Sequence, residues 1–346
     1  MVHETVKISA DEEQLYDRQI RLWGLDAQNK LRNASVLIIG VTGLGAEVAK
    51  TLILAGVYQV SLVDKDVVAA HEMESNFFIS PEDVGKNRAE ASFESLQKLN
   101  PLVKLTVENF DSLSDDDFLK SFELVIVLDQ IYNLTKAINN KCRADNIKFQ
   151  AGGVYGWIGY AFTDYNKKPF MVKKEIDIDC YDDSKTNGVN GDIPSIKVTD
   201  EPEMEEKQFE FTSYEETLNF VFDFKNMKAS AKRKFPFRFP LIQACVQLGE
   251  NEGPSALKET YETWLEQNGY ADARLNIDDD KYKFYRMPQL GLATSVLGGM
   301  IGQQAISVVS QDSFKIKNFF IYSPDKDGGL VYDIPKQYKQ FAATQQ

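Results

Sequence analysis

The fold of this chain is decided by residues 36–45, Val-Leu-Ile-Ile-Gly-Val-Thr-Gly-Leu-Gly. The four leading apolar residues predict a buried strand, and the glycines allow a tight turn into a helix expected over 45–55. Backbone N–H groups at the start of such a helix suit a phosphate. A second strand, expected over 58–63, leads to Asp64, about where a ribose-binding carboxylate is expected. The pattern predicts a nucleotide-binding type of fold.

The turn departs from the usual Gly-x-Gly-x-x-Gly pattern at its middle position. Gly40, Gly43 and Gly45 are present, but Thr42 occupies the position where the backbone must approach the phosphates most closely. Its Cβ and hydroxyl would stand in that space. We therefore expect a nucleotide-type fold whose own nucleotide site is degenerate.

The composition restricts the function. The 346 residues carry a formal net charge of −13, which argues against nucleic-acid binding because that needs a basic surface. Neither a secretory signal nor an apolar run of membrane-spanning length is evident, so we expect no membrane partner. Cys142, Cys180 and Cys245 form no CxxC pair and give no metal-site pattern. A cysteine nucleophile is conceivable, but Cys142 and Cys245 fall in helical, apolar surroundings typical of inert thiols.

Strands and helices alternate along the first half of the chain. This alternation predicts an α/β, Rossmann-like fold with a mainly parallel sheet covered by helices on both faces. The expected strands are 36–39, 58–63, 103–107, 124–128, 147–150 and 319–322, and the expected helices are 11–32 with a break at Gly24, 45–55, 86–99, 114–120, 131–144, 236–249, 261–268 and 288–307.

The chain divides into three parts by composition. Residues 8–172 are expected to form the Rossmann-like part of the domain, and 208–335 its remainder, including a buried apolar helix at 288–307. Residues 173–207 are predicted to be an exposed, flexible acidic insertion. They are polar, and the stretch 200–210 holds six acidic residues against one lysine.

Several motifs together resemble the adenylating domain of ubiquitin-like-modifier-activating enzymes and their bacterial sulfur-carrier relatives. The motifs are Tyr-Asp-Arg-Gln-Ile-Arg-Leu-Trp-Gly at 16–24, Gly-Leu-Gly-Ala-Glu at 43–47 with Leu-Ile-Leu-Ala-Gly at 52–56, Val-Gly-Lys-Asn-Arg-Ala-Glu-Ala at 84–91 with Leu-Asn-Pro at 99–101, and the Gly and Gln pairs at 298–299 and 303–304. Within that family, the resemblance and the length favour the smaller subunits of heterodimeric SUMO-activating enzymes.

The resemblance implies a division of labour between two subunits. A larger subunit would bind ATP and Mg, adenylate the C-terminus of SUMO and hold it as a thioester on its own cysteine. This chain would supply a pseudo-adenylation half and be inactive alone. The apolar helix 288–307 and neighbouring surfaces are expected to bury against the larger subunit. A location in the nucleus, with some cytoplasm, follows from the same resemblance.

The family's site residues carry over only in part. Asp64 matches the ribose aspartate, and Asp129 matches the metal aspartate, although an aspartate at a strand end can equally cap or turn. The family's Asn-x-x-Arg-Gln segment aligns to 72–76, where Ser75 replaces the arginine. The family's lysine aligns to Arg88. With Glu72 and Glu74 adding negative charge, we expect no functional nucleotide or metal site here; its degenerate residues are Gly40, Thr42, Gly43, Gly45, Asp64, Ser75, Arg88 and Asp129.

One arginine is expected to be catalytic in trans. Arg18 matches the residue that, in this family, reaches across the dimer into the partner's ATP site; the alternative is a surface arginine on an amphipathic helix. Arg21 is expected to be solvated or salt-bridged. The basic run from Lys225 to Lys234 fits a solvated helix face or a nuclear-import patch.

Two other functions stay open. A dinucleotide-binding, oxidoreductase-like protein is opposed by Thr42 and by the segment 16–24 before the first strand. A self-sufficient homodimeric adenylating enzyme for a sulfur carrier is opposed by Ser75, Glu72 and the lack of CxxC pairs.

Overall fold

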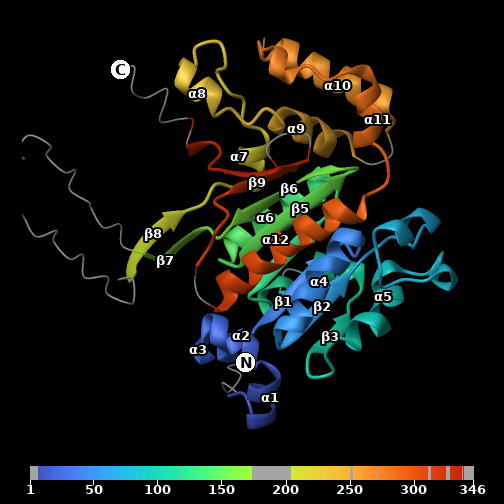
Figure 1. The fold of residues 1–346 in the computed structure, drawn as a ribbon, viewed down its shortest axis with the longest axis vertical. Coiled ribbons are helices and arrows are strands. Elements are labelled where there is room, and N and C mark those ends of the chain that lie inside the picture. Colours follow the sequence, from blue (N-terminus) through green and yellow to red (C-terminus); the bar gives the residue numbers. More distant parts are fainter. Residues whose placement is uncertain are drawn as a thin grey trace, which may run out of the picture.

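The computed structural model describes residues 7–115, 117–173, 204–249, 252–270, 272–310, 313–324, 328–336 and 338. These residues form an eight-stranded sheet in the order β10-β9-β6-β5-β4-β1-β2-β3, with helices packed on it, and a two-stranded sheet β7-β8 (Figure 1). The strands are β1 (Ser35–Ile39), β2 (Gln59–Val63), β3 (Lys104–Val107), β4 (Leu124–Leu128), β5 (Lys148–Tyr155), β6 (Ile158–Asp164), β7 (Lys167–Lys173), β8 (Met204–Glu210), β9 (Phe319–Ser323) and β10 (Gly328–Tyr332).

Twelve α-helices lie in the described part of the chain. They are α1 (Ala10–Leu15), α2 (Asp17–Trp23), α3 (Leu25–Leu31), α4 (Gly43–Ala55), α5 (Arg88–Gln97), α6 (Tyr132–Ala144), α7 (Tyr214–Leu218), α8 (Ala229–Arg233), α9 (Phe239–Leu248), α10 (Pro254–Gln267), α11 (Tyr282–Tyr285) and α12 (Gly291–Ser310).

The sheet confirms the predicted α/β class. Strands β3, β2, β1, β4 and β5 are parallel, whereas β5, β6, β9 and β10 pair antiparallel. The chain proceeds from β1 to β2 and β3 on one side, and through β4, β5 and β6 on the other. The order therefore reverses between β1 and β4, and ligands of doubly wound folds bind beside the carboxyl ends of strands at such a switch point.

The central strand β1 is buried on both faces. Val36 and Ile38 pack into one hydrophobic core with α4 and α12, whereas Leu37 and Ile39 pack into a second core with α6 and α9. Alternate side chains of a strand point to opposite faces, so a continuous apolar run fits a sheet that helices cover on both sides.

Helix α12 lies alongside α4 at very short range (Figure 1). A Cβ on Gly298 would lie 2.5 Å from the Glu47 Cβ, and one on Gly302 would lie 2.6 Å from the Thr51 Cγ2. Contrary to the expectation from the sequence, this helix is long and apolar enough to cross a membrane by length and composition. Most of its residues are instead buried inside the protein.

Two predicted helices differ from those observed. The expected helix at 114–120 is wrong: the chain makes 3-10 turns at Phe110–Ser114 and Phe118–Ser121. Aspartates there bind nearby backbone, as when Asp115 accepts from the N–H of Asp117, and such bonds compete with helix formation. The expected helix 11–32 breaks at Gly24, as predicted, and also at Tyr16, which caps α1 and α2.

The two ends of the predicted insertion pair with each other as strands. Strand β8 pairs with β7 in a register that places Met204 opposite Lys173, so both ends of the expected 173–207 insertion belong to a two-stranded sheet. Glu205, Glu206 and Lys207 are exposed, and main-chain pairing rather than burial holds them. Residues 174–203, including Cys180, lie outside the described residues.

The helix contact predicts opposite effects of alanine at adjacent glycines. Gly298→Ala should lower the free energy of unfolding, because overpacking against the Glu47 Cβ typically costs about 1–3 kcal/mol. Gly299→Ala meets no atom within 4 Å and should stabilise the helix by about 0.5–1 kcal/mol. Urea unfolding of both variants measures the difference, and equal midpoints would contradict this account of the α4–α12 contact.

Candidate functional site

The predicted turn between β1 and α4 is built on glycines. Gly40 has φ of +96°, and a Cβ there would lie 2.0 Å from the Leu128 carbonyl oxygen. A Cβ on Gly45 would lie 2.0 Å from the Gly40 carbonyl oxygen. No other residue type fits either position without backbone movement, so these two glycines shape the turn.

Thr42 uses its hydroxyl inside the turn. It caps α4 by accepting from the Gly45 N–H at 3.5 Å, and it donates to the Asp129 Oδ2 at 2.5 Å. Asp129 follows β4 in a left-handed conformation with φ of 51°, and its Oδ1 accepts from the Val154 N–H at 2.8 Å. Both oxygens of the candidate metal ligand are therefore bound to the protein, which gives Asp129 a role in stabilising the turn.

The start of α4 is covered. A Cβ on Gly43 would lie 2.6 Å from the Ser75 Oγ, and Ser75 itself is buried. The Asn76 amide donates to the Val41 carbonyl at 3.5 Å. The segment 72–76 therefore packs directly on the helix N-terminus that a phosphate would approach.

Arg88 is neutralised by neighbouring carboxylates. Its guanidinium lies 2.6 Å from the Glu72 carboxylate, 3.4 Å from Asp66 and 3.7 Å from Asp64. Glu72 also accepts from the Ala69 N–H at 2.8 Å, which fixes it in place. Charged groups held in such contacts with low exposure are strongly paired, so Arg88 has little charge to offer a phosphate.

The two glutamates expected to repel a nucleotide behave differently. Glu72 is buried on Arg88, whereas Glu74 is exposed. We expected both glutamates to repel a nucleotide. The geometry instead supports neutralisation of Arg88 by Glu72. The cause is tertiary, because the segment that carries Glu72 folds over the start of α5.

Backbone N–H groups of this chain bind the Asp64 carboxylate, so it is not presented to a ligand. Its Oδ2 accepts from the Val41 N–H at 2.7 Å and its Oδ1 from the Asp66 N–H at 2.9 Å. Burial raises the pKa of Asp64, opposed by these bonds and by Arg88. Asp66 was not among the residues expected from the sequence, although its position two residues after Asp64 could have suggested it. The Val154 N–H was not among them either, and the sequence offers no signal for it.

A cavity of about 370 Å³ adjoins this network. Of the predicted site residues, only Arg88 and Asp129 line it. No group of three or more His, Cys, Asp or Glu residues within the described ranges is arranged to hold a metal ion. With Arg88 paired and the α4 N-terminus covered, these residues do not fit a magnesium-bound triphosphate. The cavity is lined by Lys65, Asp66, Val67, Arg88, Asp129, Gln130, Ile131, Tyr155, Val246 and Gly249.

Helix α2, which carries Arg18, is fixed at the far end of α4. Tyr16 is buried and its hydroxyl accepts from the Asn100 amide at 2.8 Å. The Gln19 amide donates to the Leu54 carbonyl at 3.3 Å. These contacts turn Tyr16 and Gln19 inward, and Arg18 lies exposed between them in sequence.

Arg18 is remote from this chain's own turn. Helix α4 has 13 residues and is about 20 Å long at 1.5 Å per residue. The turn lies at its start and α2 at its end, so Arg18 cannot serve the turn of its own chain. Arg21, by contrast, pairs with Asp17 at 3.1 Å, as expected for a salt-bridging surface residue.

The described cysteines are poor nucleophiles. Cys142 and Cys245 are free and buried. Burial raises the pKa of each thiol to about 12, so almost no thiolate is present at neutral pH.

The fold and turn thus define a doubly wound α/β protein of the adenylating type. The ThiF family model matches residues 16–335, and the chain belongs to that family. SUMO-activating enzyme subunit aos-1 of Caenorhabditis elegans is 35% identical over 345 residues, covering 95% of this chain and 99% of that protein. The human SUMO-activating enzyme subunit 1 is 32% identical over 338 residues, with coverage of 94% and 95%.

Solved structures agree on the fold. MccB in complex with N-formylated MccA matches with a TM-score of 0.54 at 15% identity, covering 94% of this chain and 74% of that one. PaaA matches with a TM-score of 0.55 at 14% identity, covering 93% and 83%. At these identities the likeness extends to the fold alone.

Asp129 offers a test of its structural role. Asp129→Asn should preserve stability, since the amide can accept from Val154 and bond Thr42, and asparagine tolerates the left-handed conformation. Asp129→Ala should cost about 1–3 kcal/mol, because it leaves buried polar groups unpaired.

The pH dependence of stability tests the Asp129 carboxyl itself, which both substitutions remove. Burial is the largest cause that raises the pKa of Asp129 in the folded state. Its ionisation therefore removes stability as pH rises from the ordinary aspartate pKa through the raised one. Asp129→Asn should abolish that loss, so its stability relative to the native chain should rise across this interval. Chemical unfolding at several pH values measures this, and a falling difference would contradict it.

Proposed function

We propose that this chain is the smaller, non-adenylating subunit of a heterodimeric SUMO-activating enzyme. The observation that carries the proposal is the placement of Arg18: exposed on a firmly anchored helix, at the end of α4 remote from the chain's own turn. Relatives described as SUMO-activating enzyme subunit 1 match nearly end to end, which supports the same assignment.

In this proposal the larger subunit binds ATP and Mg. The chain's own turn is poorly suited to a triphosphate, because Glu72 neutralises Arg88 and Ser75 covers Gly43. The larger subunit would adenylate the SUMO C-terminus and then capture it on its own cysteine. A nuclear location, with some cytoplasm, remains a prediction.

Arg18 would act in the partner's site. A guanidinium keeps its charge at any physiological pH and presents a planar fork of donors that suits phosphate oxygens. Within the described part of the chain, no carboxylate is paired with Arg18, whereas Arg21 is held by Asp17. Arg18 is thus the arginine of this helix that a partner's phosphates can engage.

The surroundings of Arg18 suit a protein interface. Leu15, Leu22, Leu25 and Leu54 are exposed to between 44 and 77%. Large apolar side chains gathered on one surface mark an interaction site. The expectation that α12 and neighbouring surfaces bury against the partner stays a prediction, and most of α12 lies in this chain's own core. Its exposed and half-buried positions are left for such a contact: Gly291, Leu292, Ser295, Val296, Gly299, Met300 and Gln303.

The two rival functions fit less well. An oxidoreductase-like dinucleotide site needs an open α4 N-terminus, which Ser75 covers. A self-sufficient adenylating enzyme needs several cations on the phosphates, whereas Glu72 holds Arg88 and leaves Lys65 as the remaining cation in the lining of the cavity. ATP–pyrophosphate exchange by this chain alone would support the latter; exchange only after addition of the larger subunit supports our proposal.

Replacement of Arg18 tests the trans role. Arg18→Ala should leave the heterodimer assembled but slow adenylation about 100- to 1000-fold, the typical effect of losing one preorganised donor to a transition-state charge. Arg18→Lys should restore only part of the rate, since a point charge cannot reproduce a two-pronged contact. SUMO-dependent pyrophosphate exchange at saturating SUMO measures the rate.

Arg21→Ala is the matched control. It removes the same charge from the same helix, and its exposed pair with Asp17 contributes little. Its exchange rate should stay near that of the native complex. Equal exchange rates for the Arg18→Ala and native heterodimers would show that Arg18 is a surface residue without a role in adenylation.

The cysteines supply an independent test. Alanine at Cys142, Cys180 and Cys245 together should leave thioester formation by the complex intact, apart from stability lost at the buried sites. Non-reducing gels of the SUMO thioester report the outcome. A triple variant that assembles and adenylates SUMO but forms no thioester would show that the nucleophile is in this chain.

A further inference from the structure

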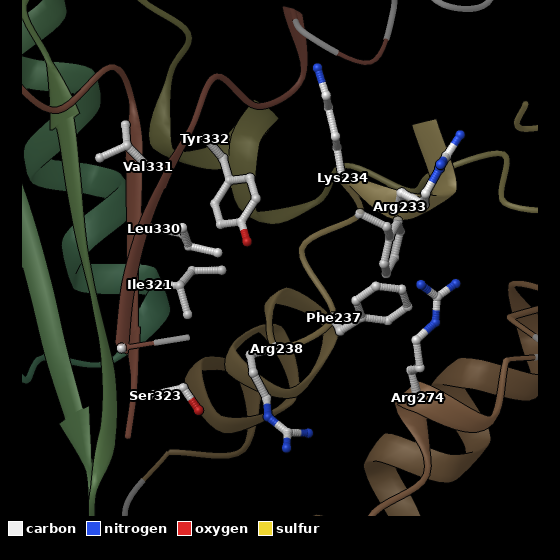
Figure 2. Close-up of a pocket in the computed structure, with 12 residues that line it drawn as sticks. Arg233, Lys234, Phe237, Arg238, Arg274, Ile321, Ser323, Leu330, Val331 and Tyr332 are labelled. Carbon is white, nitrogen blue, oxygen red and sulfur yellow. The ribbon is translucent and has the colours of Figure 1, made fainter. Parts of the chain in front are cut away.

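A second groove of about 630 Å³ lies between the hairpin β9–β10 and the segment 233–238 (Figure 2). It is separate from the turn of α4 and has no role in the function proposed above. Its lining combines apolar and basic side chains: Arg233, Lys234, Phe235, Phe237, Arg238, Arg274, Ile321, Ser323, Gly328, Leu330, Val331 and Tyr332.

One wall of the groove is the face of the β9–β10 pair at the exposed edge of the sheet. β10 is the last strand of the sheet within the described residues, and Gly328 to Val331 are exposed. Leu330 and Val331 are each 45% exposed. In an edge strand, part of the backbone N–H and C=O groups point away from the sheet and can pair with another strand. Gly328–Tyr332 itself holds no lysine, and an exposed apolar edge of this kind is suited to such pairing.

The opposite wall is basic. Arg233, Lys234, Arg238 and Arg274 line the groove, and none of its described lining residues is acidic. Arg233 and Lys234 are exposed, and Figure 2 shows both on the segment across the groove from the strands, with Lys234 extending along the rim and Arg233 directed away from the strands. Such a concentration of positive charge is notable in a chain with net charge −13. It includes the end of the basic run from Lys225 to Lys234.

Phe237, Ile321 and Leu330 form the apolar floor of the groove. The Arg274 guanidinium lies 4.1 Å from the centre of the Phe237 ring and pairs with Asp272 at 2.6 Å. Ile321 and Leu330 project from the strands toward Phe237 (Figure 2). Because Arg274 covers the Phe237 ring, that ring is not free to stack on a nucleic-acid base, which single-strand binding usually requires.

We propose that this groove binds an extended acidic peptide of a partner protein, added as a strand along β10. Main-chain bonds to the strand edge would give the affinity. Alternate side chains of an added strand point to opposite faces of the sheet. Acidic residues on the groove side would meet the basic wall, and aliphatic residues would lie on the other face beside Val331, so acidic and aliphatic residues in alternation fit best. The charges of Arg233 and Lys234 select acidic sequences.

The test uses a fluorescent seven-residue peptide in which glutamate and valine alternate. It is titrated with the full-length chain, and every variant is measured in the same oligomeric state. Binding is followed by anisotropy. We expect saturable binding that weakens with salt, and no binding of the peptide with lysine in place of glutamate. Arg233→Ala with Lys234→Ala should weaken binding about tenfold, as expected for loss of charged hydrogen bonds.

Lys225→Ala with Lys228→Ala is the matched control. Both lysines are exposed and belong to the same basic run, but neither lines the groove. This variant should bind within about twofold of the native chain, since exposed charges outside the contact contribute little. An equal loss in both double variants, or no loss in either, would overturn the groove as the site.

The strand geometry is tested on the peptide. N-methylation of alternate residues removes the donors on one edge of the peptide only. One methylated series should fail to bind and the other should bind normally, because only one edge faces β10. Equal tolerance of both series would overturn strand addition. Tighter binding of a single-stranded oligonucleotide of equal charge would overturn the choice of an acidic peptide.

Discussion

Close backbone approach along helix α4 is the constraint on which the rest of this structure depends. At its start, Gly45 lies against the Gly40 carbonyl; along its side, Glu47 contacts Gly298; at its end, Gly56 lies where a Cβ would meet the Tyr16 ring at 2.5 Å. None of these contacts leaves space for a side-chain carbon. The same helix thereby sets the position of the turn, of α12 and of the helix that carries Arg18.

The degenerate turn keeps its architecture while its charges are satisfied internally. Glu72 takes the position of an anion beside Arg88, and Asp129 and Thr42 bind each other across the turn. A paired buried arginine costs less than an unpaired one, so these replacements maintain the fold without a bound phosphate. In our proposal, these contacts maintain a nucleotide-type fold that binds no phosphate of its own, and the functional cation is Arg18.

The sequence predicted the local elements well where their periodicity was strong. The strand and turn at 36–45 and the break at Gly24 were both found. It failed at 114–120, where aspartates bind the backbone, and at 204–207, where strand pairing rather than composition decides the structure. Such pairing joins residues far apart in the chain, so a local pattern cannot reveal it.

By itself, the sequence determined the α/β class, the degenerate turn and the candidates Arg18, Asp64, Arg88 and Asp129, because glycine sterics and apolar periodicity act over a few residues. Only the tertiary structure decided that Glu72 neutralises Arg88 and that Arg18 lies about 20 Å of helix away from its own turn. It also placed basic side chains opposite the edge of β10. The reason is physical: ion pairs and grooves depend on distances in space, which are set only when the sheet and its covering helices pack together.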